Sequence, residues 1–154
     1  MRISRAASLA IGLAAAVVVG IALLTQYVGG LQPCELCLYE RWPYYAAIPV
    51  ALLAWLMPRR VLLALLALIF IAGSVLAFYH VGVEQHWFAG PSACTGGPAG
   101  ANSIEALQRM LESRQPVSCD APQWSFMGIT LAGLNFIASV LLALFALWSW
   151  RRAR

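Results

Sequence analysis

Four cysteines are the residues of this 154-residue chain with the clearest capacity for chemistry. Cys34 and Cys37 form a Cys-x-x-Cys motif, and Cys94 and Cys119 follow later in the sequence. A Cys-x-x-Cys pair closes a small disulfide ring that other thiols open readily, and the same spacing can also supply half of a zinc site. The cysteines therefore indicate disulfide exchange. A four-cysteine zinc site and two purely structural disulfides are the alternatives.

The composition indicates a membrane protein. Hydrophobic residues make up 62% of the chain and charged residues 10%, whereas soluble domains average about 45–50% and about 25%. All ten cations are arginines, and no basic face with interleaved aromatic residues occurs between the apolar runs. We therefore expect the bilayer to be a partner and nucleic acid not to be one.

Four uncharged apolar runs predict the elements that position the cysteines. A helix of about 20 apolar residues crosses a hydrocarbon core of about 30 Å. We expect an all-α membrane protein, an antiparallel four-helix transmembrane bundle that forms a single integral membrane domain over residues 1–154. The predicted spans are residues 8–28, 40–57, 61–83 and 127–150, and the predicted outer loops are residues 29–39 and 84–126.

The arginines predict the orientation of this bundle. Seven of the ten lie at the two termini and in the link between the second and third runs, and three lie on the other side, at the start of the second span and in the second outer loop. The excess of arginine marks the cytoplasmic side, so we expect both termini in the cytoplasm. All four cysteines then face the extracytoplasmic side, where disulfides form and persist.

The second outer loop carries a helix signal of its own. Asn102-Ser103-Ile104-Glu105 resembles a capping box, and apolar residues then recur at helical spacing up to Leu111. We expect a short amphipathic helix on the membrane surface.

The first outer loop places charged residues beside the Cys-x-x-Cys pair. A second span that starts near Leu38 puts Cys37 at a helix N-terminus, where the partial positive charge favours a thiolate. Arg41 comes one helical turn later. It is expected either to reach the membrane surface as an anchor or to stabilise this thiolate and polarise an acceptor carbonyl. Glu40 is expected to be a solvated partner rather than a base.

Three polar residues stand in or near the other spans. We expect His80 to lie on a helix face with a hydrogen-bond partner, and His86 to be a candidate for touching a ligand at the interface. The spacing of these histidines predicts no metal site. Asn135 is expected to form an interhelical hydrogen bond.

The string Cys34-Glu35-Leu36-Cys37-Leu38-Tyr39-Glu40-Arg41 resembles the first-loop motif of the bacterial disulfide bond formation protein B (DsbB) family. The second loop, with Cys94 and with Cys119-Asp120 before Trp124 and Gly128, is also similar to it. The resemblance implies a thiol:quinone oxidoreductase of the bacterial inner membrane. Such a protein reoxidises a soluble periplasmic thioredoxin-fold oxidase of the DsbA type and passes the electrons to a membrane quinone, ubiquinone or menaquinone.

The resemblance also implies roles for individual residues. Cys94 would receive the reactive thiolate of the partner, and Cys119 would then attack Cys34. Cys37 would be released as a thiolate beside the quinone, and electron transfer would restore the Cys34–Cys37 disulfide. Two further residues would contact the quinone: they are Arg41 and His86. The alternative is a non-enzymatic four-span membrane protein with structural disulfides.

Overall fold

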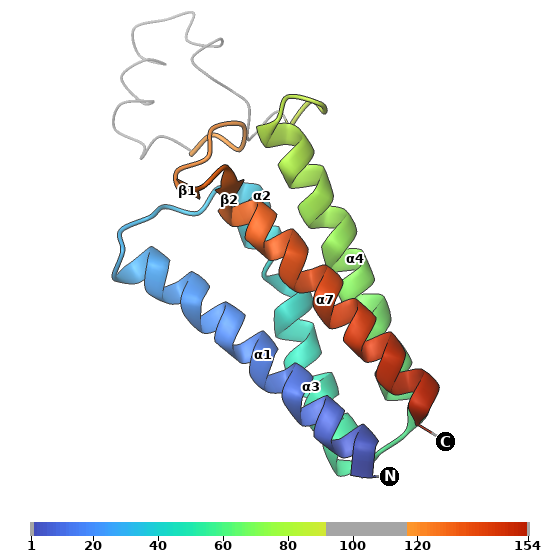
Figure 1. Cartoon of the computed structure of the whole chain (residues 1–154). Helices are drawn as coiled ribbons and strands as arrows, with labels where there is room; N and C mark the ends of the chain where they lie inside the picture. The colour runs from blue at the N-terminus through green and yellow to red at the C-terminus, as the bar shows by residue number, and fades with distance from the viewer. Residues whose placement is uncertain (1, 92–116, 154) are drawn as a thin grey trace, which may run out of the picture.

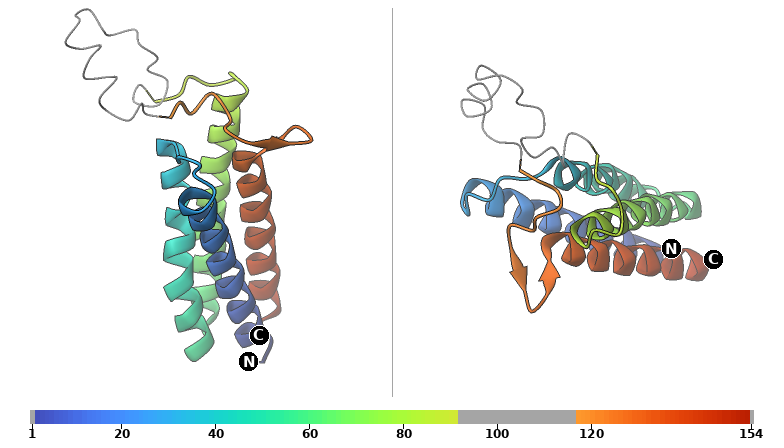
Figure 2. Two further views of the ribbon diagram at one scale, coloured as in Figure 1. Left: turned by 90° about the vertical axis from the view of Figure 1, so that its left-hand side faces the viewer. Right: turned by 90° about the horizontal axis from the view of Figure 1, so that it is seen from above.

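The computed structural model describes residues 2–91 and 117–153, and helices form most of this part of the chain. The long ones are α1 (Arg2–Tyr27), α3 (Trp42–Leu56), α4 (Arg60–Glu84) and α7 (Leu131–Arg152). They run alternately up and down, and both ends of the chain lie at the same end of the bundle (Figure 1). A view at right angles shows the four helices side by side (Figure 2, left). The fold is therefore an antiparallel helical bundle.

Three of these helices are long and apolar enough to cross a membrane. They are α1, α4 and α7, and they correspond to the first, third and fourth predicted spans. The helix in the second predicted span, α3, has only 15 residues. The expectation of a helical, multi-pass membrane protein is thus confirmed at the level of these three helices.

The outer surface of the bundle is apolar. Exposed leucine, valine and isoleucine side chains follow α1 along its length, among them Leu13, Val17 and Leu24. Water would disfavour so continuous an apolar surface, whereas lipid does not. The interior is filled by residues of several helices, and the edge of the buried Tyr44 ring meets Phe70 with 5.6 Å between ring centroids. Tyr44 thus ties α3 to α4.

The fourth long helix begins later than the sequence predicted. Met127 and Gly128 have φ angles of 51° and 83°, and two positive φ angles in succession make a tight hairpin turn. The turn joins β1 (Ser125–Phe126) to β2 (Ile129–Thr130), so a small hairpin replaces the predicted first residues of the span. Thr130 then caps α7, because its hydroxyl accepts a hydrogen bond from the backbone N–H of Gly133 at 3.1 Å.

The first loop also contains a helix, α2 (Glu35–Tyr39), which ends before α3 begins. The sequence predicted a loop over residues 29–39 and a span from residue 40, whereas the structure forms α2 within that loop and leaves Glu40 and Arg41 between α2 and α3. The amphipathic helix predicted from Asn102 to Leu111 lies outside the described residues, and so does Cys94.

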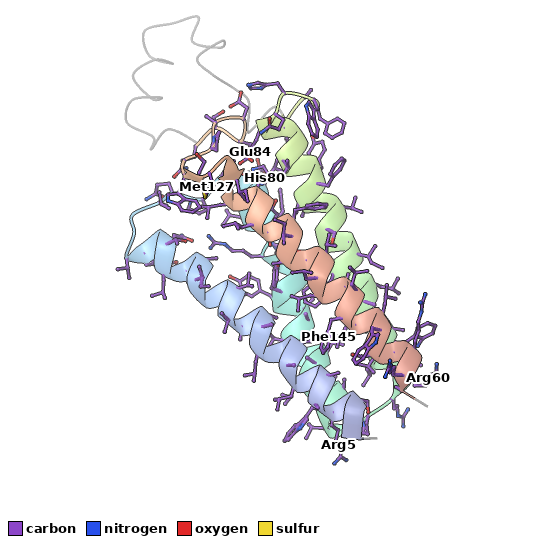
Figure 3. The ribbon with its side chains drawn as sticks, viewed as in Figure 1. Arg5, Arg60, His80, Glu84, Met127 and Phe145 are labelled. Atoms are coloured by element: carbon purple, nitrogen blue, oxygen red, sulfur yellow. The ribbon has the colours of Figure 1, made fainter. Side chains whose placement is uncertain are left out.

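The two ends of the bundle differ in chemistry. Arg5 and Arg60 lie at the end where the termini meet, and His80, Glu84 and Met127 lie at the opposite end (Figure 3). The loop with the cysteine pair joins the bundle at this second end (Figure 1). Candidate chemistry is therefore confined to the end away from the termini.

Candidate active site

The cysteine pair is built on the first turn of α2. Cys34 is the N-cap residue of this helix, and its sulfur accepts a hydrogen bond from the backbone N–H of Cys37 at 3.2 Å. The two Sγ atoms are 2.9 Å apart, and neither cysteine is in a disulfide. Capping by Cys34 brings its sulfur to the exposed N–H groups of the helix, whose partial positive charge stabilises an anion.

The environment makes Cys34 the acidic thiol of the pair. A hydrogen bond from Cys37 lowers the pKa of Cys34 to about 4, and a further hydrogen bond from His80 lowers it too, while burial opposes both. The same sulfur contact and burial raise the pKa of Cys37. The sequence predicted a thiolate on Cys37; in the reduced pair the structure favours the thiolate on Cys34, because Cys34 occupies the helix cap.

A buried histidine and a buried carboxylate stand behind Cys34. The Nε2 atom of His80 is 3.6 Å from the Sγ of Cys34, and the Nδ1 atom is 2.8 Å from the Oε1 of Glu40. Glu40 is only 6% exposed, so the expectation of a solvated Glu40 was wrong. The break between α2 and α3 turns this side chain inward. The expected hydrogen-bond partner of His80 is confirmed, and it is Glu40.

A hydrogen-bond network continues from Glu40 into the bundle. The side-chain amide of Asn135 donates to the Oε2 of Glu40 at 2.8 Å, and the hydroxyl of Tyr44 donates to the Oδ1 of Asn135 at 2.6 Å. The Ser139 hydroxyl lies 2.9 Å from that of Tyr44. The expected interhelical hydrogen bond of Asn135 is confirmed. The network connects α3, α4 and α7 at the level of the thiols.

Arg41 is the first residue before α3 rather than a residue one turn along α2. Its Nη1 atom donates to the Oε1 of Gln26 on α1 at 2.6 Å. This bond attaches the cysteine loop to α1. Sequence reasoning missed Gln26, although it is a polar side chain in the last turn of an apolar run.

An apolar cavity of about 290 Å³ joins these groups. Cys34, Cys37, Arg41 and His80 line it, together with residues from α1, α7 and the segment that follows residue 116. Its wall also includes two exposed apolar side chains, Ile21 on α1 and Leu134 on α7, which are 54% and 44% exposed. The cavity therefore reaches the lipid-facing surface of the bundle between these two helices. It suits a lipid-soluble ligand with a polar end.

The second loop brings one of its cysteines to the same place. Cys119 is buried and disulfide-bonded, and it packs in one apolar cluster with Cys34, Leu36 and Val83. Cys119 also lines the cavity. Cysteines from the two loops thus belong to one buried cluster and line one cavity.

The structure does not bring His86 into this cavity. His86 follows the end of α4 with a φ of 59° and lines a separate hollow beside Trp87 and Asp120. The histidine that meets the cysteines is His80. The expected contact of His86 with a ligand stays a prediction.

Three side chains of the site could hold a metal ion. The ligand atoms of Cys34, Cys37 and His80 all lie within 4.8 Å of one another. Structural zinc sites use four such ligands. No spacing pattern indicates this group, because His80 lies 46 residues after Cys34. The four-cysteine alternative does not fit the structure, since Cys119 is in a disulfide.

Comparisons with known proteins agree with the chemistry of this site. The family model of the disulfide bond formation protein DsbB matches residues 4–149. The chain is 32% identical over 155 residues to a disulfide bond formation protein B of Azoarcus sp. (strain BH72), which covers 90% of this chain and 89% of the relative. It is 33% identical over 147 residues to a disulfide bond formation protein B of Ralstonia nicotianae, and the match covers 92% of this chain and 90% of the relative. An uncharacterized protein of Rickettsia prowazekii is 28% identical over 129 residues, with 80% and 74% covered.

Proposed function

Because the chain belongs to the disulfide bond formation protein DsbB family, we propose that it is a membrane thiol:quinone oxidoreductase. In this proposal it oxidises a soluble thioredoxin-fold protein of the DsbA type and transfers the electrons to a membrane quinone. The family itself assigns the chain a role in disulfide bond formation. The quinone and the soluble partner are the proposed parts.

The observation that carries the proposal is the cavity. It places the thiols of Cys34 and Cys37 and the guanidinium of Arg41 at one apolar site that reaches the lipid-facing surface. A quinone dissolves in the bilayer and, when bound, would accept two electrons and two protons. Arg41 can donate hydrogen bonds to a carbonyl oxygen, and the apolar wall can hold the ring and its tail. Ubiquinone and menaquinone fit this description equally.

The proposed exchange between the loops rests on the place of Cys119 and Cys34 in one buried cluster and at one cavity. The thiolate of the partner attacks the sulfur of Cys94: a mixed disulfide forms, the Cys94–Cys119 bond breaks, and Cys119 leaves as a thiolate. Cys119 then attacks the sulfur of Cys34: a Cys34–Cys119 bond forms, the Cys34–Cys37 bond breaks, and Cys37 leaves as a thiolate. A Cys34 thiolate is what chiefly raises the pKa of Cys37 in the reduced pair. While Cys34 is bonded to Cys119 it is no longer a thiolate, so it no longer raises the pKa of Cys37 in this way.

The proposed topology adds α3 as a fourth span, in one integral membrane domain over residues 1–154. The 15 residues of α3 contain no charged side chain, and the chain must return before α4 begins. Arg5 and Arg60 lie at the end with the termini (Figure 3), and arginine marks the cytoplasmic side. We therefore place the protein in the bacterial inner membrane, with both termini in the cytoplasm and all four cysteines in the periplasm.

The proposal is tested with the purified protein in liposomes and a reduced thioredoxin-fold oxidase of the DsbA type. We expect many turnovers of partner oxidation when the liposomes contain ubiquinone or menaquinone, and none without a quinone. Alkylation of free thiols followed by gel electrophoresis measures the redox state of the cysteines in both proteins. Disulfides that stay intact throughout, with the partner still reduced, would instead support the structural alternative.

A further inference from the structure

We propose that His80, oriented by Glu40, is the acid–base residue that takes up the proton of Cys34 and holds its sulfur as a thiolate while the Cys34–Cys37 disulfide is rebuilt. This inference rests on the proposed function, because rebuilding the disulfide requires an oxidant, the membrane quinone. It adds a catalytic histidine that the sequence motif does not contain and that lies on a different helix from the cysteines.

The three side chains have the order of a nucleophile, a base and an orienting acid. The sulfur of Cys34 meets the Nε2 of His80 at 3.6 Å, and the Nδ1 of His80 meets the Oε1 of Glu40 at 2.8 Å. A carboxylate accepts a hydrogen bond from Nδ1–H and so favours the tautomer whose Nε2 carries a lone pair. That lone pair takes up the thiol proton, and the resulting Nε2–H then donates a hydrogen bond to the Cys34 thiolate.

Burial makes an internal base necessary. Cys34, His80 and Glu40 are 5%, 2% and 6% exposed, so water has little access to the thiol proton. A histidinium in such a place needs a nearby negative charge, which the carboxylate of Glu40 provides. His80 can therefore gain or lose a proton without leaving an unpaired charge buried, because Glu40 lies beside it.

Glu40 is itself fixed from two other helices. Its second oxygen accepts a hydrogen bond from Asn135 on α7, and Asn135 is held by the hydroxyl of Tyr44 on α3. The carboxylate is therefore prevented from rotating away from His80. Glu40 acts through His80, which makes it a positioning residue.

The other titratable groups around His80 do not provide an alternative base for the proton of Cys34. They are Cys37 on α2, Tyr44 on α3, Glu84 on α4 and Arg41 in the cavity wall. Glu84 accepts a hydrogen bond from Thr130 at 2.6 Å. The residues of α1 and α7 that line the cavity include no titratable side chain. Within the described residues, His80 is the side-chain base in contact with the sulfur of Cys34.

The proposed step conserves atoms and electrons. The S–H bonds of both cysteines break: the proton of Cys34 binds the Nε2 of His80, the proton of Cys37 passes to the quinone, and the two sulfurs form the new S–S bond. Two electrons leave the thiol pair for the quinone. His80 then releases its proton into the cavity, where reduction of a quinone to a quinol consumes two protons.

The test uses the full-length chain with Cys94→Ala and Cys119→Ala, so that only Cys34 and Cys37 react. His80→Gln is compared with Ser74→Ala, a matched change on the same helix, since within the described residues the Ser74 hydroxyl bonds only the carbonyl of Phe70 in its own helix. Two quantities are measured: the pH midpoint of Cys34 alkylation without quinone, and the rate of reduction of a short-chain ubiquinone as a function of pH.

We expect His80→Gln to move the alkylation midpoint of Cys34 upward and to slow quinone reduction about 100-fold near neutral pH. The defect should shrink in alkaline solution, where hydroxide removes the proton, and the KM for the quinone should stay the same. Ser74→Ala should change neither quantity. An unaltered midpoint together with an unaltered pH–rate profile in His80→Gln would overturn the inference.

Two further outcomes have defined meanings. If the parent protein reduces no quinone at any pH, the proposed function fails, and the alkylation midpoint still decides whether His80 acts on Cys34. If His80→Gln does not fold, Glu40→Gln takes its place. It should shift the same midpoint and pH profile in the same direction with a smaller loss, about tenfold, and a wild-type profile would again overturn the inference.

Discussion

The Nε2 atom of His80 lies 3.6 Å from the Sγ of Cys34, although the two residues are 46 positions apart and belong to different elements. This contact connects the thiol pair of the first loop to a network of polar side chains inside an apolar bundle. It also makes the two cysteines chemically different, because Cys34 contacts both a helix N–H and a histidine.

The first prediction concerns the reactivity of the reduced pair. The pKa of Cys34 is lowered to about 4 and that of Cys37 is raised. Iodoacetamide should therefore modify Cys34 at a rate that is constant from about pH 5 upward, since only the thiolate reacts. Cys37 should react only in alkaline solution. Peptide mapping by mass spectrometry measures both rates.

Exposure alone predicts the opposite order, because Cys34 is buried and Cys37 is partly exposed. Preferential modification of Cys37 at about pH 6, with an ordinary thiol midpoint for Cys34, would contradict the electrostatic assignment.

The bundle was largely predictable from the sequence because charged residues mark the ends of its helices. The predicted span 61–83 agrees within one residue at each end with α4 (Arg60–Glu84). The start of α7 was not predictable in this way. It depends on the positive φ angles of Met127 and Gly128, which no pattern of apolar residues reveals.

The site was predictable only in part. The cysteines and the hydrogen bond of Asn135 followed from residue type and location. The burial of Glu40 did not, because it depends on where α2 stops and α3 starts. His80 could not be paired with Cys34 because their contact is set by how α4 packs against the first loop.

A second prediction concerns Arg41. Arg41→Ala should raise the KM for a short-chain ubiquinone about tenfold or more, because a charged hydrogen-bond donor to a carbonyl is lost. Gln26→Ala should have a smaller effect in the same direction, since it removes the bond that holds Arg41.

The matched control for Arg41 is Tyr39→Phe, which removes only an exposed hydrogen bond to Glu35. Steady-state kinetics of quinone reduction distinguish the variants. An unchanged KM in Arg41→Ala would return this residue to the role of a membrane anchor.

A third prediction concerns the order of exchange between the loops. Cys119→Ala should accumulate a mixed disulfide between Cys94 and the soluble partner, because no neighbouring thiol remains to resolve it. Mass spectrometry of the adduct identifies the partner. Cys94→Ser should block oxidation of the partner while the Cys34–Cys37 pair still forms its disulfide. Full partner oxidation by both variants would show that the second loop takes no part.

A fourth prediction concerns stability. Thr130→Val removes the cap of α7 and the hydrogen bond from the Thr130 hydroxyl to Glu84. We expect the free energy of unfolding to fall by about 1–2 kcal/mol. Thr25→Val is the control, because the Thr25 hydroxyl bonds only the carbonyl of Ala22 in its own helix. Thermal unfolding in detergent compares the two, and equal losses would show that the contact with α4 contributes nothing.

The central claim, that the first-loop pair gives its electrons to a quinone, is tested most directly in a single turnover. Reduced protein with Cys94→Ala and Cys119→Ala is mixed with one equivalent of a short-chain ubiquinone, and quinol absorbance and remaining thiols are measured together. The account predicts one quinol and one Cys34–Cys37 disulfide per chain, and neither product when Cys37→Ser is added. Thiols that persist beside unreduced quinone, or quinol formed without Cys37, would contradict it.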